Sequence, residues 1–245
     1  GDTIRIQKAS ANTAASYTID FIELENVTPI ARPANTLSIV DYGAVANDSG
    51  DDTTAIVSAI AAARAQGKRV WIPAGQFRQS TAIAAERVEI LGAGMWYAEI
   101  WGFNPRGDNA VGFQVTGGGA VFRDFRIRGE QTIRGNTSWA KSGFFGTFGT
   151  GSEVHDVWIE HTQCGAWVGV DNPTNPATNL VFDGLRIRNV FADGINLCNG
   201  TTTTVVKNCT ARSTGDDSFA SWSAPAAPRA NAGNTFRNNT SECTW

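Results

Sequence analysis

Residues 37–77 read LSIVDYGAVANDSGDDTTAIVSAIAAARAQGKRVWIPAGQF, and this stretch indicates how the chain begins to fold. Asp51 or Asp52 stands where a helix cap is expected, just before a helix that starts near Thr53. Gly67 follows the last apolar position and ends this helix. The segment RVWIPAG then predicts a strand, so an amphipathic helix lies between two strands. The apolar stripe of the helix consists of Ile56, Ile60 and Ala63.

From residue 85 onward the sequence repeats a short strand-like pattern. Each repeat has an apolar pair, two or three polar residues and a further apolar position. Placing one apolar residue of each repeat in a common register gives steps of 32, 28 and 24 residues. Unequal steps suit the coils of a parallel β-helix, in which strands stack about 4.8 Å apart and loops differ in length. The aligned residues are Phe125, Val157, Leu185 and Cys209.

Two segments of this repeat, FADGINL and TGDDSFA, carry carboxylates at matching places. The 24-residue step places Asp193 beside Asp217 in successive coils, and Asp216 is one added carboxylate. Gly194 then coincides with Ser218, and these small residues are expected to leave open space beside the acids. The sequence therefore predicts a local cluster of three aspartates.

Stacked carboxylates repel one another and raise each other's proton affinity, so they indicate either a catalytic use or a bound cation. A glycosidase needs one protonated and one ionised acid, which neighbouring carboxylates can supply. An oxygen-rich cluster can also hold calcium, and a lone aspartate before glycine commonly caps a turn. The doubled aspartate in the second coil favours catalysis.

The direction of these side chains is a separate question. Ile195 and Phe219 are expected to face the core. Strict alternation would direct Asp193 and Asp217 inward as well, where unpaired charges are costly. A bend or bulge before Gly194 and Ser218 is therefore needed to turn them toward solvent.

The stretch quoted first resembles the N-terminal cap of the pectate-lyase-like right-handed parallel β-helix proteins, in which a helix covers the open end of the solenoid. DYGA, the acidic helix cap and IPAG, which occur together at suitable spacing, carry this resemblance. It implies an all-β fold, a right-handed parallel β-helix with an N-terminal capping α-helix.

ADGINL, followed after 23 and 24 residues by the aspartates of GDDSFA, resembles the catalytic constellation of the β-helical inverting glycosidases. Polygalacturonases of glycoside hydrolase family 28 also carry a Gly-His-Gly downstream, whereas residues 218–245 contain no histidine. Family 87, the bacterial α-1,3-glucanases and mycodextranases, is similar in its preceding β-sandwich, its helical cap and the residues around all three aspartates. The chain is identified as a member of family 87 over nearly its whole length.

This resemblance implies an endo-acting, inverting hydrolase of the α-1,3-glucosidic linkages of mutan or nigeran. Its catalytic residues would be Asp193, Asp216 and Asp217. By analogy with the related polygalacturonase site, Asp216 is the general acid, and the other two orient and deprotonate the attacking water. The chemistry requires no cofactor and no metal ligand is assigned, although the long insertion at residues 129–151 is compatible with a structural calcium.

The domain organisation follows from a change of pattern. Residues 1–30 alternate apolar and polar positions and are expected to be the last strands of an upstream β-sandwich, with a linker near residues 27–35. Residues 31–245 are expected to form the N-terminal part of the β-helical catalytic domain. Matching Thr240 to Thr210 ends the chain before the next cleft-lining strand, so further C-terminal coils are expected.

The composition argues against several partners. With 20 basic and 23 acidic side chains and no Lys/Arg run, the chain lacks a nucleic-acid footprint. No stretch approaches the roughly 18 apolar residues of a membrane span. We expect a secreted, extracellular monomer that acts on a polysaccharide. The four cysteines lack zinc-ligand spacing, and either disulfides or buried free thiols would account for them.

Some of the eight tryptophans are candidates for stacking on sugar rings. We expect this of Trp222, five residues beyond Asp217, and of Trp139 in the long insertion, whereas Trp167 is expected in the core. Three other functions stay open: a polygalacturonase-like hydrolase, a calcium-dependent polysaccharide lyase, and a non-catalytic carbohydrate-binding β-helix.

Overall fold

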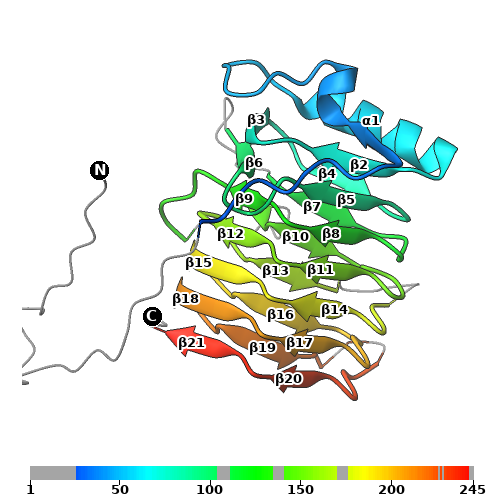
Figure 1. The fold of residues 1–245 in the computed structure, drawn as a ribbon. Coiled ribbons are helices and arrows are strands. Elements are labelled where there is room, and N and C mark those ends of the chain that lie inside the picture. Colours follow the sequence, from blue (N-terminus) through cyan, green and yellow to red (C-terminus); the bar gives the residue numbers. More distant parts are fainter. Residues whose placement is uncertain are drawn as a thin grey trace, which may run out of the picture.

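The computed structural model describes residues 26–103, 111–134, 141–169, 176–225, 227 and 229–242. Over these residues the chain forms a parallel β-helix of three parallel sheets, with one α-helix and one short 3-10 helix, η1 (Ile39–Tyr42), near its start (Figure 1). From β2 onward consecutive strands belong to different sheets, and each coil lies on the one before it. The predicted parallel β-helix is confirmed.

The three sheets are named here in the order in which a coil visits them. Sheet 1 contains β1 (Thr36–Ser38), β2 (Arg69–Ile72), β5 (Glu89–Gly92), β8 (Val121–Arg123), β11 (Glu153–His155), β14 (Val181–Asp183), β17 (Val205–Lys207) and β20 (Thr235–Arg237). Sheet 2 contains β3 (Gly75–Gln79), β6 (Ala98–Gly102), β9 (Arg126–Arg128), β12 (Trp158–Glu160), β15 (Arg186–Val190), β18 (Thr210–Thr214) and β21 (Thr240–Glu242). Sheet 3 contains β4 (Ile83–Ala85), β7 (Phe113–Val115), β10 (Phe144–Gly146), β13 (Ala166–Val168), β16 (Ile195–Cys198) and β19 (Phe219–Trp222).

The strand register confirms the alignment of the repeats. In sheet 2, Arg126 pairs with Trp158, Trp158 with Arg186, and Arg186 with Thr210, which are the predicted steps of 32, 28 and 24 residues. The next pair joins Thr210 to Thr240, as expected. The four aligned apolar residues, each directly before one of these strands, are almost fully buried: Phe125, Val157, Leu185 and Cys209.

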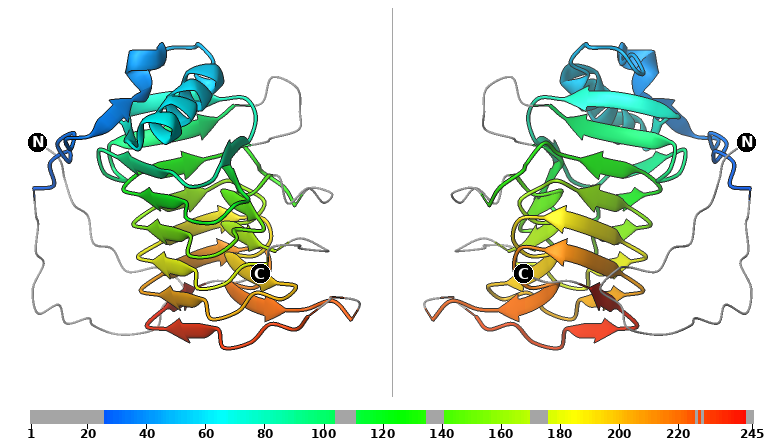
Figure 2. Two further views of the ribbon diagram at one scale, coloured as in Figure 1. Left: turned by 90° about the vertical axis from the view of Figure 1, so that its right-hand side faces the viewer. Right: turned by 90° about the vertical axis from the view of Figure 1, so that its left-hand side faces the viewer.

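Helix α1 (Thr53–Gln66) has the predicted bounds and lies across the end of the stack that holds the first strands (Figure 2). Gly67 ends it in the left-handed conformation, with φ of 60°, and its N–H reaches the carbonyls of the last turn. The predicted stripe faces the sheets and is buried: Ile56, Ile60 and Ala63. The helix therefore closes the apolar interior at this end.

Two acidic residues before the helix have different tasks. Asp52 occupies the N-cap position without a side-chain cap hydrogen bond, and Asp51, one residue earlier, accepts hydrogen bonds from the backbone N–H and the hydroxyl of Thr53. Asp52 is buried and accepts the backbone N–H groups of Val45 and Arg78, both at 2.8 Å. Burial raises the pKa of Asp52, and these two hydrogen bonds oppose that rise. Asp52 thus ties the helix start to the preceding turn and to β3.

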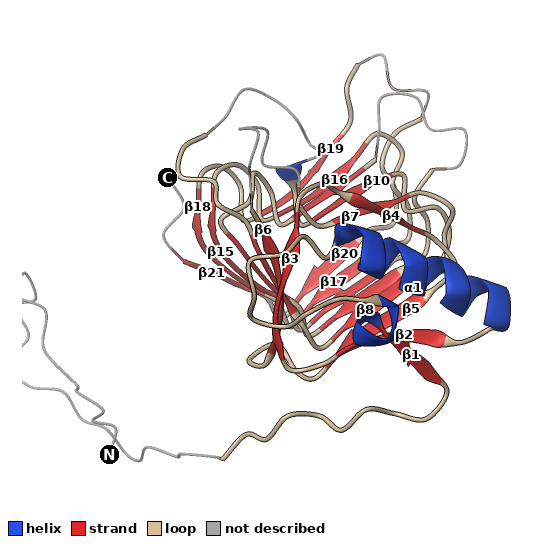
Figure 3. Cartoon of the chain, turned by 90° about the horizontal axis from the view of Figure 1, so that it is seen from above, coloured by secondary structure: helices blue, strands red, loops and turns tan. Residues whose placement is uncertain are grey.

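The three sheets surround the interior, as the view along the stack shows (Figure 3), and the core runs lengthwise inside them. Phe113 of β7 and Phe144 of β10, paired in sheet 3, stack with ring centroids 6.0 Å apart, and Phe122 of sheet 1 lies 5.1 and 4.8 Å from them. Repeated apolar positions thus build ladders, and the loops between strands are free to carry polar side chains.

Residues 1–25 lie outside the described residues, so the β-sandwich expected for residues 1–30 stays a prediction. The described chain starts on the β-helix itself, where Val27 accepts a hydrogen bond from the hydroxyl of Tyr97 and Ile30 donates one to Ala93. Three cysteines are buried and form no disulfide among the described residues, Cys164, Cys198 and Cys209, and Cys243 lies outside the described residues. In the described part of the chain, no helix has the length and apolarity that crossing a membrane requires.

Candidate active site

The three predicted aspartates lie in the turns that lead from sheet 2 into sheet 3. Asp193 stands between β15 and β16, and Asp216 and Asp217 stand between β18 and β19, one coil later. The backbone N–H of Gly194 donates to the carbonyl of Asp217 at 2.8 Å, so these two turns are stacked in the predicted register. One carboxylate oxygen from each aspartate lies within 4.8 Å of the other two. The structure brings all three acids together.

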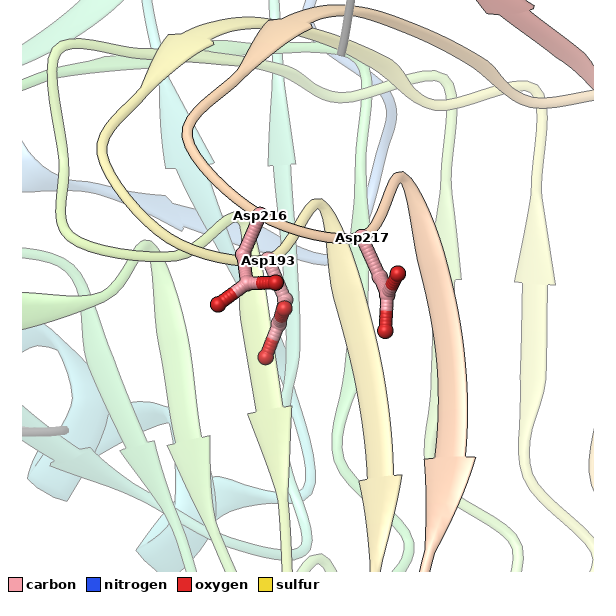
Figure 4. A group of neighbouring side chains, drawn as sticks. All are labelled: Asp193, Asp216 and Asp217. Atoms are coloured by element: carbon pink, nitrogen blue, oxygen red, sulfur yellow. The ribbon is translucent and has the colours of Figure 1, made fainter. Parts of the chain in front are cut away.

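A bend turns these side chains away from the core. The chain bends at Gly194 and Ser218, directly after Asp193 and Asp217, before the strands of sheet 3 begin. All three carboxylates extend to the same side of the ribbon, with Asp193 beside Asp216 and Asp217 displaced to one side (Figure 4). The required bend is therefore present, and strict strand alternation does not apply in the turn.

The small residues beside the acids have another purpose than the one expected. A Cβ at Gly194 would collide with the carbonyl of Ser218, and one at Gly165 would collide with the carbonyl of Gly194. Ser218 itself is buried and bonds the hydroxyl of Ser241 in the following coil. The expectation of open space was wrong, because these positions are where one coil presses against the next.

Asp193 is the buried member of the cluster, with 7% of its surface exposed. Its Oδ2 accepts a hydrogen bond of 2.5 Å from Nδ2 of Asn196. Burial raises the pKa of Asp193, and the negative charges of Asp216 and Asp217 raise it further, while the bond from Asn196 opposes the rise. Asp193 therefore retains a proton to higher pH than an isolated aspartate.

Asp216 is exposed and has a cation beside it. Nη2 of Arg134 donates to Oδ2 of Asp216 at 2.7 Å, and Nη1 donates to the carbonyl of Gly215 at 3.1 Å. The bond to Asp216 raises the pKa of Arg134. Arg134 belongs to the insertion at residues 129–151, so this insertion adds the positive charge that the coils themselves do not bring to the cluster.

The tryptophans are arranged differently from the prediction. Trp222, at the end of β19, is 44% exposed, which agrees with a surface for substrate. Its ring meets that of Trp167 edge to face at 6.5 Å. Trp167 pairs with Asn196 and not with Ile195, so it faces outward and is only partly buried. Its expected place in the core was wrong by one residue of register. Trp139 lies outside the described residues.

Three residues of the site were not found from the sequence: Arg134, Asn196 and Trp167. Asn196 and Trp167 had a usable signal, because residues next to inward-facing Ile195 and Ala166 must face outward on sheet 3. Arg134 had none, because its insertion has no counterpart in the neighbouring coils. Together they add an amide donor, an aromatic ring and a guanidinium to the three carboxylates.

This arrangement suits two kinds of chemistry. Carboxylates of different burial can divide a general acid and a general base between them. Three oxygens so close together can also coordinate a hard cation. This is the one such group of potential metal ligands among the residues that the structure describes. The ion pair with Arg134 supplies positive charge from the protein itself, which favours the acid–base use.

Comparison with known families gives an independent assignment. A family model for the α-1,3-glucanase catalytic domain D2 matches residues 49–245. The Agl-KA catalytic domain is 36% identical and covers 87% of this chain, with a TM-score of 0.75. The catalytic unit of a thermostable GH87 α-1,3-glucanase from Streptomyces thermodiastaticus is 34% identical over 87%, also with a TM-score of 0.75. None of the curated proteins with which the sequence was compared matches it.

Further solved structures are GH87 α-1,3-glucanase catalytic domains with bound sugars. The complex with nigerose is 32% identical, covers 85% of this chain and has a TM-score of 0.70. Related complexes carry single aspartate-to-alanine replacements, at positions separated by 23 and by 24 residues. The present chain spans between 35% and 39% of the Agl-KA, Streptomyces and nigerose-bound chains. On the family model and these identities, the chain belongs to the GH87 family of α-1,3-glucanase catalytic domains.

Proposed function

We propose that this chain carries the catalytic centre of an endo-acting, inverting α-1,3-glucanase, with Asp193, Asp216 and Asp217 as its acid and base groups. The observation that carries the proposal is the meeting of these three carboxylates within 4.8 Å in two stacked turns. Their separations along the chain, 23 and 24 residues, equal those of the aspartates replaced in the GH87 complexes with nigerose and tetrasaccharides.

We assign the roles within the cluster from exposure. Asp216 is exposed and can reach the leaving oxygen of a glucan, so we assign it the general acid. For this role Arg134 has to leave Asp216 when substrate binds, because a guanidinium beside a carboxylate favours its ionised form. Asp193 and Asp217 then orient and deprotonate the attacking water.

Inversion sets a requirement on distance. An inverting acid and base stand roughly 6.5–9.5 Å apart so that water fits between them. The 4.8 Å separation applies to one oxygen of each carboxylate, so water and sugar have to bind against the outer oxygens of the exposed pair. The stereochemistry of the product is therefore the decisive property to measure.

The substrate is proposed from the family and from the aromatic surface. Trp222, with Trp167 beside it, offers an exposed ring on the outer face of sheet 3, next to the strand that follows Asp193. Flat apolar faces of glucose units pack on such rings. We propose α-1,3-glucan as the substrate class, with Trp222 as a binding residue, and Trp139 stays a predicted one.

The test is to incubate the full chain with mutan, nigeran, dextran and polygalacturonate and to follow released sugars and their anomeric form by NMR. Release of β-anomeric products from mutan or nigeran alone is expected for inversion at an α-linkage. Products with an initial α-configuration would contradict inversion. Unsaturated products that absorb in the ultraviolet, together with loss of activity on chelation, would indicate a calcium-dependent lyase. No product from any of these polymers would overturn the proposal.

A further inference from the structure

Two outward-facing residues of β16 are buried although they do not face the core. Asn196 and Cys198 alternate along the strand with the inward-facing Ile195 and Leu197, yet they are only 3% and 0% exposed. Outward positions on a β-helix normally meet solvent. Something on the outer face of sheet 3 therefore covers this pair.

The tryptophan pair lies beside this part of β16. Trp167 lies on β13 and Trp222 on β19, the strands on either side of β16, and they pair with Asn196 and Cys198 respectively. Because their rings meet at 6.5 Å, they reach toward each other across the outer face of β16. The burial of Asn196 and Cys198 strengthens any hydrogen bond between them.

The hydrogen bonds of this buried pair form a chain that ends on an aspartate. The thiol of Cys198 donates to Oδ1 of Asn196 at 3.0 Å. Nδ2 of Asn196 donates to Oδ2 of Asp193 at 2.5 Å. A thiol is a better donor than acceptor and an ionised carboxylate is only an acceptor, so both neighbours favour the same orientation of the amide.

We propose that Cys198 and Asn196 are positioning residues, which hold the amide of Asn196 in one orientation and so keep Oδ2 of Asp193 as a hydrogen-bond acceptor. A proton on Asp193 then resides on Oδ1, the oxygen that does not receive the amide. This inference rests on the proposed function, because it assigns a purpose to the orientation of a carboxylate in the catalytic cluster.

The physical consequence concerns proton affinity. An amide N–H that donates to a carboxylate stabilises its ionised form, and an amide oxygen turned to the same place would stabilise the protonated form. Among the described residues the thiol is the partner that holds Oδ1 of Asn196, so its removal favours that reversal and raises the proton affinity of Asp193. The relay of hydrogen bonds from Cys198 through Asn196 to Asp193 therefore opposes the effect of burial on the pKa of Asp193 and keeps this carboxylate available as a base.

The experiment compares Cys198→Ala, Cys198→Ser and Asn196→Leu in the full chain. The pKa of Asp193 is followed by ¹³C NMR of its carboxyl carbon, and kcat/KM on α-1,3-glucan is measured against pH. We expect the pKa of Asp193 and the matching limb of the pH profile to move to higher pH in Cys198→Ala and Asn196→Leu. We also expect kcat/KM to fall about tenfold, as for loss of one bond to a charged group.

Cys198→Ser retains a donor and is expected to restore the wild-type titration and kcat/KM to within a few-fold. The matched control is Cys209→Ala, which removes an equally buried thiol that donates to the carbonyl of Lys207 at 3.1 Å. It is expected to leave the titration of Asp193 and the pH profile unchanged. The double variant Asn196→Leu with Cys198→Ala should lose no more than Asn196→Leu alone.

An unchanged titration of Asp193 in Cys198→Ala would overturn the relay, as would equal shifts in the alanine and serine variants. The two proposals fail in different ways. If the wild-type chain cleaves no α-1,3-glucan but the NMR shifts occur, the proposed function fails and the relay stands. If the wild-type chain is active and the NMR shifts are absent, only the relay fails.

Discussion

Two groups of acidic residues on this β-helix differ in how their charges are balanced. On the outer face of sheet 2, Glu160 is 2% exposed and is paired with Arg126 and, at 2.6 Å, with Arg188. In the turns between sheets 2 and 3, three aspartates share the single cation Arg134 among the described ion pairs. The negative charge of Glu160 is therefore balanced by its arginines, whereas the negative charge of the three aspartates is not fully balanced.

The surroundings strengthen this difference. The ring of Trp158 lies between Arg126 and Arg188, with the guanidinium carbons 4.3 and 4.4 Å from its centroid. Glu99, two coils from Glu160, continues the pattern, with Arg126 at 3.0 Å and Arg128 at 2.9 Å. Such a network stabilises one packing of the coils. Carboxylates that the protein leaves uncompensated are available for protons, for water and for substrate.

The largest expected effect would separate the two groups by activity. Asp193→Asn, Asp216→Asn and Asp217→Asn should each lower kcat on α-1,3-glucan on the order of 1,000-fold, because each removes an acid or base group. The measurement is the initial rate of sugar release at saturating substrate. Glu160→Gln is the matched control and should keep kcat wherever the variant is folded. Full activity of any one aspartate variant would remove that residue from the catalytic group.

The second effect reverses the comparison and concerns stability. Glu160→Gln leaves two arginines without their shared buried partner and should lower the free energy of unfolding by about 3 kcal/mol. Urea denaturation measures this loss. Glu242→Gln, at an exposed position whose nearest cation is 3.9 Å away, should change it by less than about 1 kcal/mol. Equal losses in the two variants would show that burial does not set the difference.

A third effect compares the exposed tryptophans of the two regions. Trp222→Ala should raise KM for glucan about tenfold, because a sugar ring loses its stacking surface. Trp96, which is 57% exposed and packs on Trp158 beside sheet 2, is the matched control. Trp96→Ala should leave KM unchanged. A similar rise in both variants would place glucan on the sheet 2 face as well.

The smallest effect is a pH dependence of stability. Burial is the largest cause that raises the pKa of Asp193 in the folded state above the ordinary value of 3.8. Between pH 3.8 and the folded-state pKa, the folded state therefore binds a proton that the unfolded state has lost. Its contribution is then favourable at acidic pH and is lost as pH rises through the folded-state pKa. Asp193→Asn should therefore raise Tm at pH 7 by a few degrees at most, and the gain should vanish below about pH 3.8.

Asp183 provides the contrast, because its pKa is shifted in the opposite direction and its effect on stability therefore has the opposite dependence on pH. Burial alone would raise its pKa, but hydrogen bonds from Asn208 and Lys207 outweigh this and hold the pKa below 3.8. Its contribution is present above pH 3.8 and is lost as pH falls through the folded-state pKa. Asp183→Asn should therefore lower Tm at pH 7. The same sign of change in the Asp183 and Asp193 variants would contradict this account of burial against compensation.

The sequence by itself determined the parts of the protein that repeat. The helix at residues 53–66, the steps of 32, 28 and 24 residues, and the pairing of Asp193 with Asp217 all follow from local patterns. In a β-helix, equivalent residues of successive repeats stack on one another. The spacing of a repeated pattern along the chain therefore predicts which residues are neighbours in space. For this reason the catalytic candidates could be named before any coordinates.

Only the tertiary structure decided what crosses from one coil to another outside the repeat. Arg134 reaches Asp216 from an insertion without counterpart, and Gly194 is small because the next coil touches it. These outcomes depend on contacts between residues 82 and 24 positions apart, roughly three coils and one coil, in loops and turns outside the strands. Local sequence patterns carry no information about such contacts, because the loops that make them differ in length from coil to coil.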